Sequence, residues 1–178
     1  AESQFGELRK STNGGSSWFD IDAPGTGLWV APVDIDRNNP LHLYMCKAGD
    51  PGGIYRTTNG GTSWTQVHPL VARSISISPA NGVVVWGLDA SALYTTDDGA
   101  NWNNAPAFPF PTGGTLRILA HPTIPGGALC SFAGYVETQA KVAYTSDFGV
   151  TWSNVTGDLP SIPVRGLAID PELPDHWY

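Results

Sequence analysis

An eight-residue phrase occurs four times along this chain and constrains its fold more than any other feature. The copies begin at Ser11, Thr57, Thr95 and Thr145, and each follows the pattern Ser/Thr-x-Asp/Asn-x-Gly-x-x-Trp. The four closing tryptophans are 46, 38 and 50 residues apart. A period of roughly 40–50 residues is typical of proteins built from copies of one supersecondary unit. We call this segment the repeat phrase and number its positions one to eight.

The residue types of the repeat phrase predict a rigid turn followed by a packing residue. Asp or Asn at position three can accept hydrogen bonds within its own turn, and Gly at position five can adopt a positive φ. The hydroxyl at position one can bond within the same loop, and the Trp at position eight can fill the space between adjacent sheets. We therefore assign a structural role and no chemistry to Asn13, Gly15, Trp18, Asn59, Gly61, Trp64, Asp97, Gly99, Trp102, Asp147, Gly149 and Trp152.

Between the phrases, short apolar segments alternate with turn residues, and no stretch carries a sustained helical period. Four short strands joined by turns form one blade of a β-propeller, so an all-β fold of four-stranded blades is predicted. About four blade equivalents fit a small closed ring or, as we favour, a piece of a larger propeller of six to eight blades. The predicted single domain, or propeller segment, divides into a half blade at 1–24, blades at 25–69, 70–107 and 108–160, and a half blade at 161–178.

The repeat phrase resembles the Asp-box, or BNR, repeat. That repeat occurs in sialidases, sortilin-type receptors, photosystem assembly-factor propellers and two-propeller xyloglucan-cleaving endoglucanases. Four copies with intact Gly and Trp make the resemblance specific for the repeat type, and they extend over nearly the whole chain. In these families the box joins the third and fourth strands of a blade, so the resemblance implies a β-propeller.

Composition and charge exclude several classes of function. The formal net charge of −7 disfavours a nucleic-acid surface, which needs a basic stripe, and no apolar run approaches the roughly 18 residues of a membrane helix. Cys46 and Cys130 lie in different repeats and are interpreted as small buried apolar residues. The four histidines lack the spacing of metal ligands. We expect a secreted protein, extracellular or periplasmic, with no cofactor and no metal.

Propeller geometry predicts which face carries a ligand site. The third-to-fourth turns, which hold the repeat phrases, share one face with the first-to-second turns, and ligand sites usually lie on the opposite face. On that opposite face exposed aromatic rings beside carboxylates would suit a carbohydrate. The alternative is that Trp29 and Trp86 are core residues and that Asp89 and Glu137 are solvated loop charges. The candidate ligand-binding residues are Trp29, Trp86, Asp89, Tyr135 and Glu137.

Asp50 is the one catalytic candidate. The segment from Asp50 to Arg56 is similar to the Asp-x-Gly-Gly-x-Tyr-Arg segment of the xyloglucan-cleaving family, whose Asp is one of two catalytic carboxylates. The resemblance implies glycoside hydrolysis, which needs a second carboxylate across the scissile bond. In that family the second carboxylate comes from a second propeller. Because Asp-x-Gly-Gly is also common turn chemistry, a purely structural Asp50 is the alternative.

The sialidase chemistry found in some Asp-box proteins is not expected here, because none of the six arginines lies in an Arg-Ile-Pro segment. The leading hypothesis is a recognition scaffold that contacts a polysaccharide, a glycoprotein or another protein chain. The alternative is part of a xyloglucanase-like or endoglucanase-like glycoside hydrolase that cleaves β-glucans. A sortilin-like receptor fragment is a third class.

Overall fold

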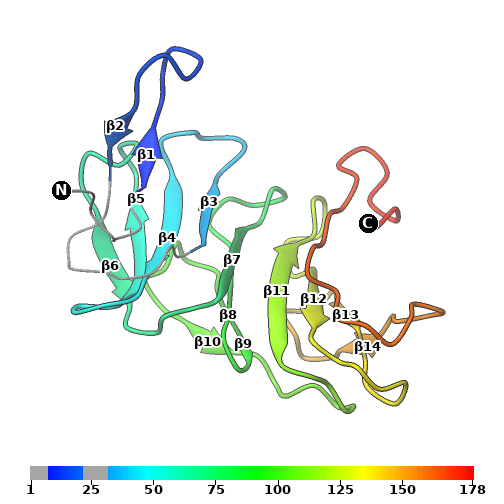
Figure 1. Cartoon of the computed structure of the whole chain (residues 1–178). Coiled ribbons are helices and arrows are strands. Elements are labelled where there is room, and N and C mark those ends of the chain that lie inside the picture. Colours follow the sequence, from blue (N-terminus) through cyan, green and yellow to red (C-terminus); the bar gives the residue numbers. More distant parts are fainter. Residues whose placement is uncertain (1–7, 22–31) are drawn as a thin grey trace. The chain divides into compact units, whose positions relative to one another are not determined.

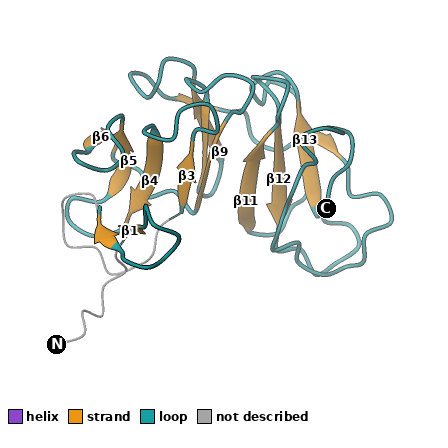
Figure 2. Ribbon diagram, turned by 90° about the horizontal axis from the view of Figure 1, so that it is seen from above, coloured by secondary structure: helices purple, strands orange, loops and turns teal. Residues whose placement is uncertain are grey.

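The computed structural model describes residues 8–21 and 32–178, and every regular element in these residues is a β-strand (Figures 1 and 2). The all-β class predicted from the sequence is therefore confirmed. The described residues contain no helix that is long and apolar enough to cross a membrane. The chain divides into two compact units, one ending at Ala72 and one beginning at Arg73, and each is described by itself.

The N-terminal unit contains a two-stranded and a four-stranded antiparallel sheet. The short hairpin consists of β1 (Arg9–Lys10) and β2 (Phe19–Asp20), with the first repeat phrase as its turn. The larger sheet lies within the predicted blade 25–69 and has its strands in sequence order: β3 (Val33–Ile35), β4 (Leu43–Lys47), β5 (Gly53–Thr57) and β6 (Thr65–His68).

The C-terminal unit contains two four-stranded antiparallel sheets, each within one predicted blade. The first sheet consists of β7 (Ser74–Ile77), β8 (Val85–Leu88), β9 (Ala92–Thr95) and β10 (Asn103–Asn104). The second consists of β11 (Thr115–Ala120), β12 (Ala128–Phe132), β13 (Val142–Thr145) and β14 (Ser153–Asn154). The last predicted pair of strands is reduced to one bridge, Ile169 with Trp177, flanked by two backbone bonds between Ala168 and Tyr178.

All four repeat phrases form the same hydrogen-bonded turn. In each, the hydroxyl at position one donates to the side-chain oxygen at position three, and the amide at position five donates to that hydroxyl. The position-three oxygen also accepts the amide of position seven, at 2.8–2.9 Å in every copy. The Asp or Asn side chain therefore closes the turn, as the sequence predicted.

The side-chain bond between positions three and seven reverses direction between copies. Asn13 and Asn59 donate to a serine hydroxyl at position seven. Asp97 can only accept, and it accepts a hydrogen bond from the side-chain amide of Asn101; Asp147 likewise accepts from the Thr151 hydroxyl at 2.6 Å. Donor and acceptor types at the two positions therefore match in each copy.

Each complete blade also ties its repeat phrase to its own first-to-second turn. The position-four amides of Gly60, Asp98 and Phe148 donate to turn carbonyls of Leu41, Val83 and Gly126, at 2.9–3.0 Å. The two kinds of turn therefore lie on the same face of the blade, which leaves the second-to-third loops and the blade connections at the opposite ends of the strands.

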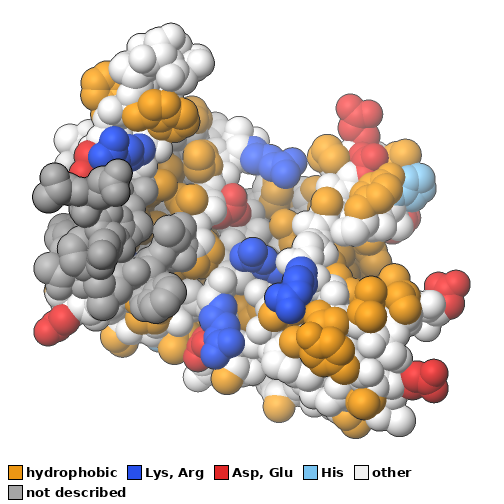
Figure 3. Space-filling view, in the orientation of Figure 1, with side chains coloured by type: hydrophobic (Ala, Val, Ile, Leu, Met, Phe, Trp, Pro, Cys, Tyr) orange, Lys and Arg blue, Asp and Glu red, His pale blue; other side chains and the backbone are white. Residues whose placement is uncertain are grey.

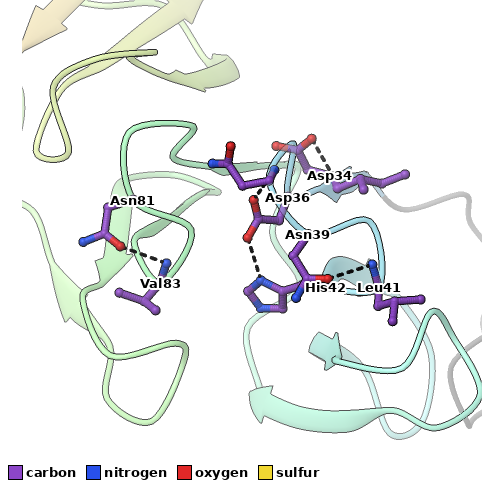
Figure 4. A network of polar contacts seen from close by, with 9 residues as sticks. Asp34, Asp36, Asn39, Leu41, His42, Asn81 and Val83 are labelled. Atoms are coloured by element: carbon purple, nitrogen blue, oxygen red, sulfur yellow. Dashed lines mark hydrogen bonds and ion pairs between the residues drawn. The ribbon is translucent and has the colours of Figure 1, made fainter.

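The first-to-second turns have a repeated geometry of their own (Figure 4). The side-chain oxygens of Asn39 and Asn81 accept the amides of Leu41 and Val83 in two different blades. In the first of these turns, the buried Asp36 carboxylate contacts Nδ1 of His42 at 3.2 Å. In the third complete blade, Nδ1 of His121 accepts the amides of Thr123 and Ile124. These histidines therefore serve the turns.

Positions five and eight of the repeat phrase pack on the preceding blade. A Cβ at Gly61 would lie 2.7 Å from the Ile21 side chain, and one at Gly149 would lie 2.6 Å from Ala105. Trp64 Nε1 donates to the Ile21 carbonyl, whereas Trp152 is buried beside Trp86 of the preceding blade, with ring centroids 6.2 Å apart. Glycine is needed here because it permits both a positive φ and this close approach.

Trp18 departs from the predicted packing role. Its side chain is 59% exposed, whereas Trp152 is 6% exposed. Trp64 and Trp102 are half-buried. The described residues include no strand ahead of β1 on which Trp18 could pack, so the prediction of a buried tryptophan at position eight is wrong for this copy in the described structure.

The core of the C-terminal unit is an aromatic cluster between its two sheets. Trp86 is fully buried and lies against Tyr94, Phe148 and Trp152, with ring centroids 5.4–6.4 Å apart. Phe148 occupies position four of its phrase at φ 60°, a left-handed conformation that is unfavourable for a bulky residue. Its ring contacts offset that cost, because offset and edge-to-face aromatic pairs stabilise a core.

We expect Asp147→Ala to lower the free energy of unfolding by about 1–3 kcal/mol, because Asp147 accepts the Thr145 hydroxyl and both the amide and the hydroxyl of Thr151. Urea unfolding measures the change. The matched control is Val150→Ala in the same turn, whose side chain is 67% exposed and whose loss should cost less than about 0.5 kcal/mol. Equal effects of the two substitutions would contradict the bracing role of Asp147.

The repeat phrases should also differ in their response to acid. Hydrogen bonds from Asn101 and Thr151 lower the pKa values of Asp97 and Asp147. Since the folded pKa lies below the unfolded one, this stabilisation is fully present above about pH 4 and is lost as the pH falls through the folded value. In an NMR titration, the amides of Asn101 and Thr151 should shift on acidification. The amides of Ser17 and Ser63, which bond to Asn side chains, should not. If all four amides shift alike on acidification, the prediction is wrong.

Candidate functional site

Three arginines converge on one pocket of the C-terminal unit. The pocket has a volume of about 350 Å³. Arg73, Arg117 and Arg165 line it together with Thr115 and Leu116. These residues come from the start of two sheets and from the segment after the last strand, so the tertiary structure assembles the pocket.

Bonds between neighbouring strands place Arg73 beside Arg117. The hydroxyl of Ser74, which follows Arg73, donates to the carbonyl of Ile118 at 3.3 Å and accepts its amide at 3.1 Å. Ile118 directly follows Arg117. The pairing of β11 with β12 shifts register between Thr115 and Arg117, and such bulges redirect side chains.

Arg165 reaches the pocket from the chain after β14. The amide of the preceding Val164 donates to the carbonyl of Phe132 at 3.2 Å. Phe132 pairs with Thr115 across β11 and β12, so this bond brings Arg165 toward the beginning of β11. The pocket is therefore built from backbone and serine contacts that do not involve the guanidinium groups.

The pocket concentrates positive charge within an acidic unit. Residues 73–178 contain four Lys and Arg residues and nine Asp and Glu residues, and three of the four cations line this pocket. In the space-filling view, Asp and Glu side chains lie at the outer edge of this unit, at the right (Figure 3). Planar guanidinium groups bind carboxylates and phosphates through paired hydrogen bonds. The arrangement therefore suits an anion.

The fourth cation, Lys141, supports a loop and does not line the pocket. Its ammonium group is buried and donates to the carbonyls of Val136 and Gln139, at 2.7 and 3.0 Å. Ala133 and Ala140 donate their amides to the carbonyls of Gly114 and Pro111. These bonds hold loop 133–141 against the segment that leads into β11.

Asp89 lies next to the pocket, and two further predicted site residues lie in the neighbouring loop. Asp89 Oδ1 accepts Nε of Arg73 at 3.0 Å, and its carbonyl accepts the Thr115 hydroxyl. Tyr135 is 66% exposed and Glu137 is exposed, both in loop 133–141. The structure thus brings these three residues to the second-to-third loops, where the sequence placed them.

Of Trp29 and Trp86, the two tryptophans predicted to bind a ligand, only Trp86 lies in the described part of the chain. Trp86 is fully buried in the aromatic core. It has no exposed ring face on which a ligand could stack, so its assignment as a ligand-binding residue is corrected to a packing role. Trp29 lies outside the described residues.

The segment around Asp50 is accounted for by turn structure. Asp50 is exposed in the loop between β4 and β5. Tyr55 donates its hydroxyl to the Pro51 carbonyl, and Gln66 donates to the Gly52 carbonyl. Gly53 has φ 151°, and a Cβ there would lie 2.3 Å from the His68 carbonyl oxygen. Gly52, Gly53 and Tyr55 of the segment therefore have a structural use in this turn.

Metal and thiol chemistry find no support in the described part of the chain. No group of three or more His, Cys, Asp or Glu residues there could hold a metal ion. Burial raises the pKa of Cys46 to about 12 and also raises the pKa of Cys130. Both thiols are buried and protonated at neutral pH, which fits the packing role predicted for them.

A second hollow, of about 380 Å³, lies between the β11–β14 sheet and the last residues of the chain. Its walls include Leu129, Val142 and Val164 as well as Trp177, whose ring lies 5.4 Å from that of Tyr144. It offers apolar surface but no convergent charged groups, so the arginine pocket is the stronger candidate.

Sequence reasoning missed the arginine pocket, although a signal for it exists. Arg73, Arg117 and Arg165 are spaced by 44 and 48 residues, close to the period of the repeat phrase. Each lies four or five residues before the residue that begins a first-to-second turn: Ser78, His121 and Asp170. Residues at equivalent places in successive blades approach one another around a propeller axis, so this spacing predicts convergence.

Comparisons with known proteins support the fold. No family model matches the chain, and no curated protein matches it. Among solved structures, YCF48 bound to D1 peptide is 23% identical with a TM-score of 0.59, and the match covers 84% of this chain and 47% of that one. An ancestral GH74 enzyme is 19% identical with a TM-score of 0.67, and the match covers 93% of this chain and 25% of that one.

The GH74 xyloglucanase from Xanthomonas campestris is 15% identical with a TM-score of 0.63, and the match covers 83% of this chain and 26% of that one. The chain thus spans less than half the length of the solved structures it resembles. Identities below 25% support a shared β-propeller fold and no shared activity.

We expect Gly53→Ala to lower the free energy of unfolding by about 1–3 kcal/mol, because alanine is strained at this φ and its Cβ would collide with the His68 carbonyl. Thermal and urea unfolding measure the change. Asp50→Ala, in the same segment but with an exposed side chain, is the control and should change stability by less than about 0.5 kcal/mol. A larger loss of stability from Asp50→Ala than from Gly53→Ala would contradict the structural role assigned to this turn.

Proposed function

We propose that this chain is a propeller module that recognises a carboxylate-bearing segment of a partner protein through the pocket of Arg73, Arg117 and Arg165. The observation that carries the proposal is the convergence of three arginines from separate segments on one pocket of an otherwise acidic unit. An acidic surface repels anions at long range, so a local cluster of guanidinium groups favours binding at that one place.

The structural neighbours support a protein ligand. One of them, YCF48, is described with a bound D1 peptide, so a related propeller fold can present a peptide-binding surface. The exposed Tyr135 and Val136 add apolar surface in loop 133–141 of the same unit, and exposed aromatic residues together with arginines are typical of protein-binding sites.

A glycan ligand has weaker support. The carbohydrate hypothesis depended on exposed aromatic platforms, and Trp86 is buried. The hydrolase hypothesis depended on Asp50, whose segment is accounted for by its turn. The likeness to GH74 enzymes supports the fold alone. A location outside the cytoplasm is part of the proposal and follows only from the Asp-box resemblance.

The proposal is tested with fluorescein-labelled hexaglutamate as the probe in fluorescence anisotropy. The triple variant Arg73→Gln, Arg117→Gln, Arg165→Gln should weaken binding by about tenfold or more, since three exposed charge pairs of about 0.5–1 kcal/mol each are lost. Binding to the unsubstituted chain should weaken as salt concentration rises.

The matched control removes three positive charges elsewhere, through Arg9→Gln, Lys10→Gln and Arg37→Gln. If this control weakens binding as much as the pocket variant, net charge and not the pocket determines affinity. If the unsubstituted chain fails to bind hexaglutamate at millimolar concentration, the proposal is wrong. Binding of a β-glucan that persists in the pocket variant would favour the glycan hypothesis instead.

A further inference from the structure

Asp89 contacts two of the five pocket residues although it does not line the pocket itself. Its carboxylate accepts Nε–H of Arg73 at 3.0 Å, and its backbone carbonyl accepts the hydroxyl of Thr115. Its own amide donates to the Ser91 carbonyl at 3.2 Å, which closes the short loop between β8 and β9. One residue of this loop therefore connects the beginnings of β7 and β11, on two different sheets.

The bond to Arg73 occupies only the inner donor of the guanidinium group. Within residues 8–21 and 32–178, the side chain of Arg73 makes this one polar contact, so its four Nη–H donors face no protein acceptor. The paired Nη–H groups at the end of a guanidinium can bind a carboxylate in a bidentate geometry. Asp89 thus binds the Nε–H of Arg73 and leaves the Nη–H groups of that arginine available to a ligand.

Stability does not explain this contact. The side chains of Arg73 and Asp89 are 68% and 35% exposed, and ion pairs in such surroundings contribute little to folding. An arginine side chain is, however, rich in rotamers, and it loses that freedom when it binds a ligand. A contact that orders the side chain beforehand lowers the entropic cost of binding.

We infer that Asp89 is a positioning residue, which orients Arg73 so that its terminal Nη atoms can bind the ligand carboxylate. The inference rests on the proposed function of the arginine pocket. It assigns Asp89 a different role from the direct ligand contact predicted from the sequence. The negative charge of Asp89, beside an anion site, then strengthens anion binding because it orders Arg73.

Substitutions at Asp89 separate positioning from simple electrostatics, again with labelled hexaglutamate as the probe. Asp89→Ala removes a negative charge next to the pocket, so electrostatics alone predict tighter binding. Positioning predicts weaker binding, by about threefold to tenfold, because Arg73 must then be ordered by the ligand. Asp89→Asn keeps the Oδ1 acceptor and loses the charge, so it should bind at least as tightly as the unsubstituted chain. All three chains retain the backbone carbonyl that holds Thr115.

Two controls make the result specific. Glu172→Gln removes one exposed negative charge from the turn that begins at Asp170, without touching Arg73, and it should leave binding unchanged or slightly stronger. In the Arg73→Gln background, Asp89→Ala should cause no further loss, because the two residues act as one unit in a double-mutant cycle. Thermal midpoints should match throughout, since the pair is exposed.

Binding by Asp89→Ala that equals or exceeds that of the unsubstituted chain would overturn the inference. So would an undiminished effect of Asp89→Ala in the Arg73→Gln background. If the triple arginine variant binds normally, the proposed function itself fails. If that variant binds poorly while Asp89→Ala binds well, the pocket stands and only the positioning role is wrong.

Discussion

The architecture depends on one side-chain oxygen per blade. In every repeat phrase this oxygen, from Asp or Asn at position three, accepts the hydroxyl of position one and the amide of position seven. The turn between the third and fourth strands is thereby closed by bonds within its own eight residues. The neighbouring amide at position four then bonds to the first-to-second turn in each complete blade. Local hydrogen bonds thus fix both the strand order and the face on which these turns lie.

The stacking of blades rests on a different kind of contact. Glycine at position five lets Ile21 and Ala105 approach the next turn closely, and the buried Trp152 packs beside Trp86 and Phe108. Serine hydroxyls on β7 bind the backbone of β11. These contacts bring the first strands of successive blades together, and the arginine pocket is a consequence of that arrangement. The pocket is therefore only as well ordered as the packing between blades.

Much of the fold could be predicted from the sequence because its determinants are local. Asp147 and Thr145 are two residues apart, and Phe148 and Gly126 lie within one blade, so pattern and spacing were sufficient. The role of Trp86 could not be decided from the sequence. Its residue type suits both a core and a ligand platform, and only burial distinguishes them. The Asp50 segment was equally ambiguous until the positions of Tyr55, Gln66 and His68 around it were known.

The sequence by itself determined that the chain repeats a four-stranded β unit with a braced turn, since each brace joins residues within eight positions. It also placed Asp89, Tyr135 and Glu137 in the loops opposite those turns. Only the tertiary structure decided that Arg73, Arg117 and Arg165 share one pocket and that Asp89 holds Arg73. The physical reason is distance along the chain: residues 44 and 48 positions apart meet only when one blade packs on the next.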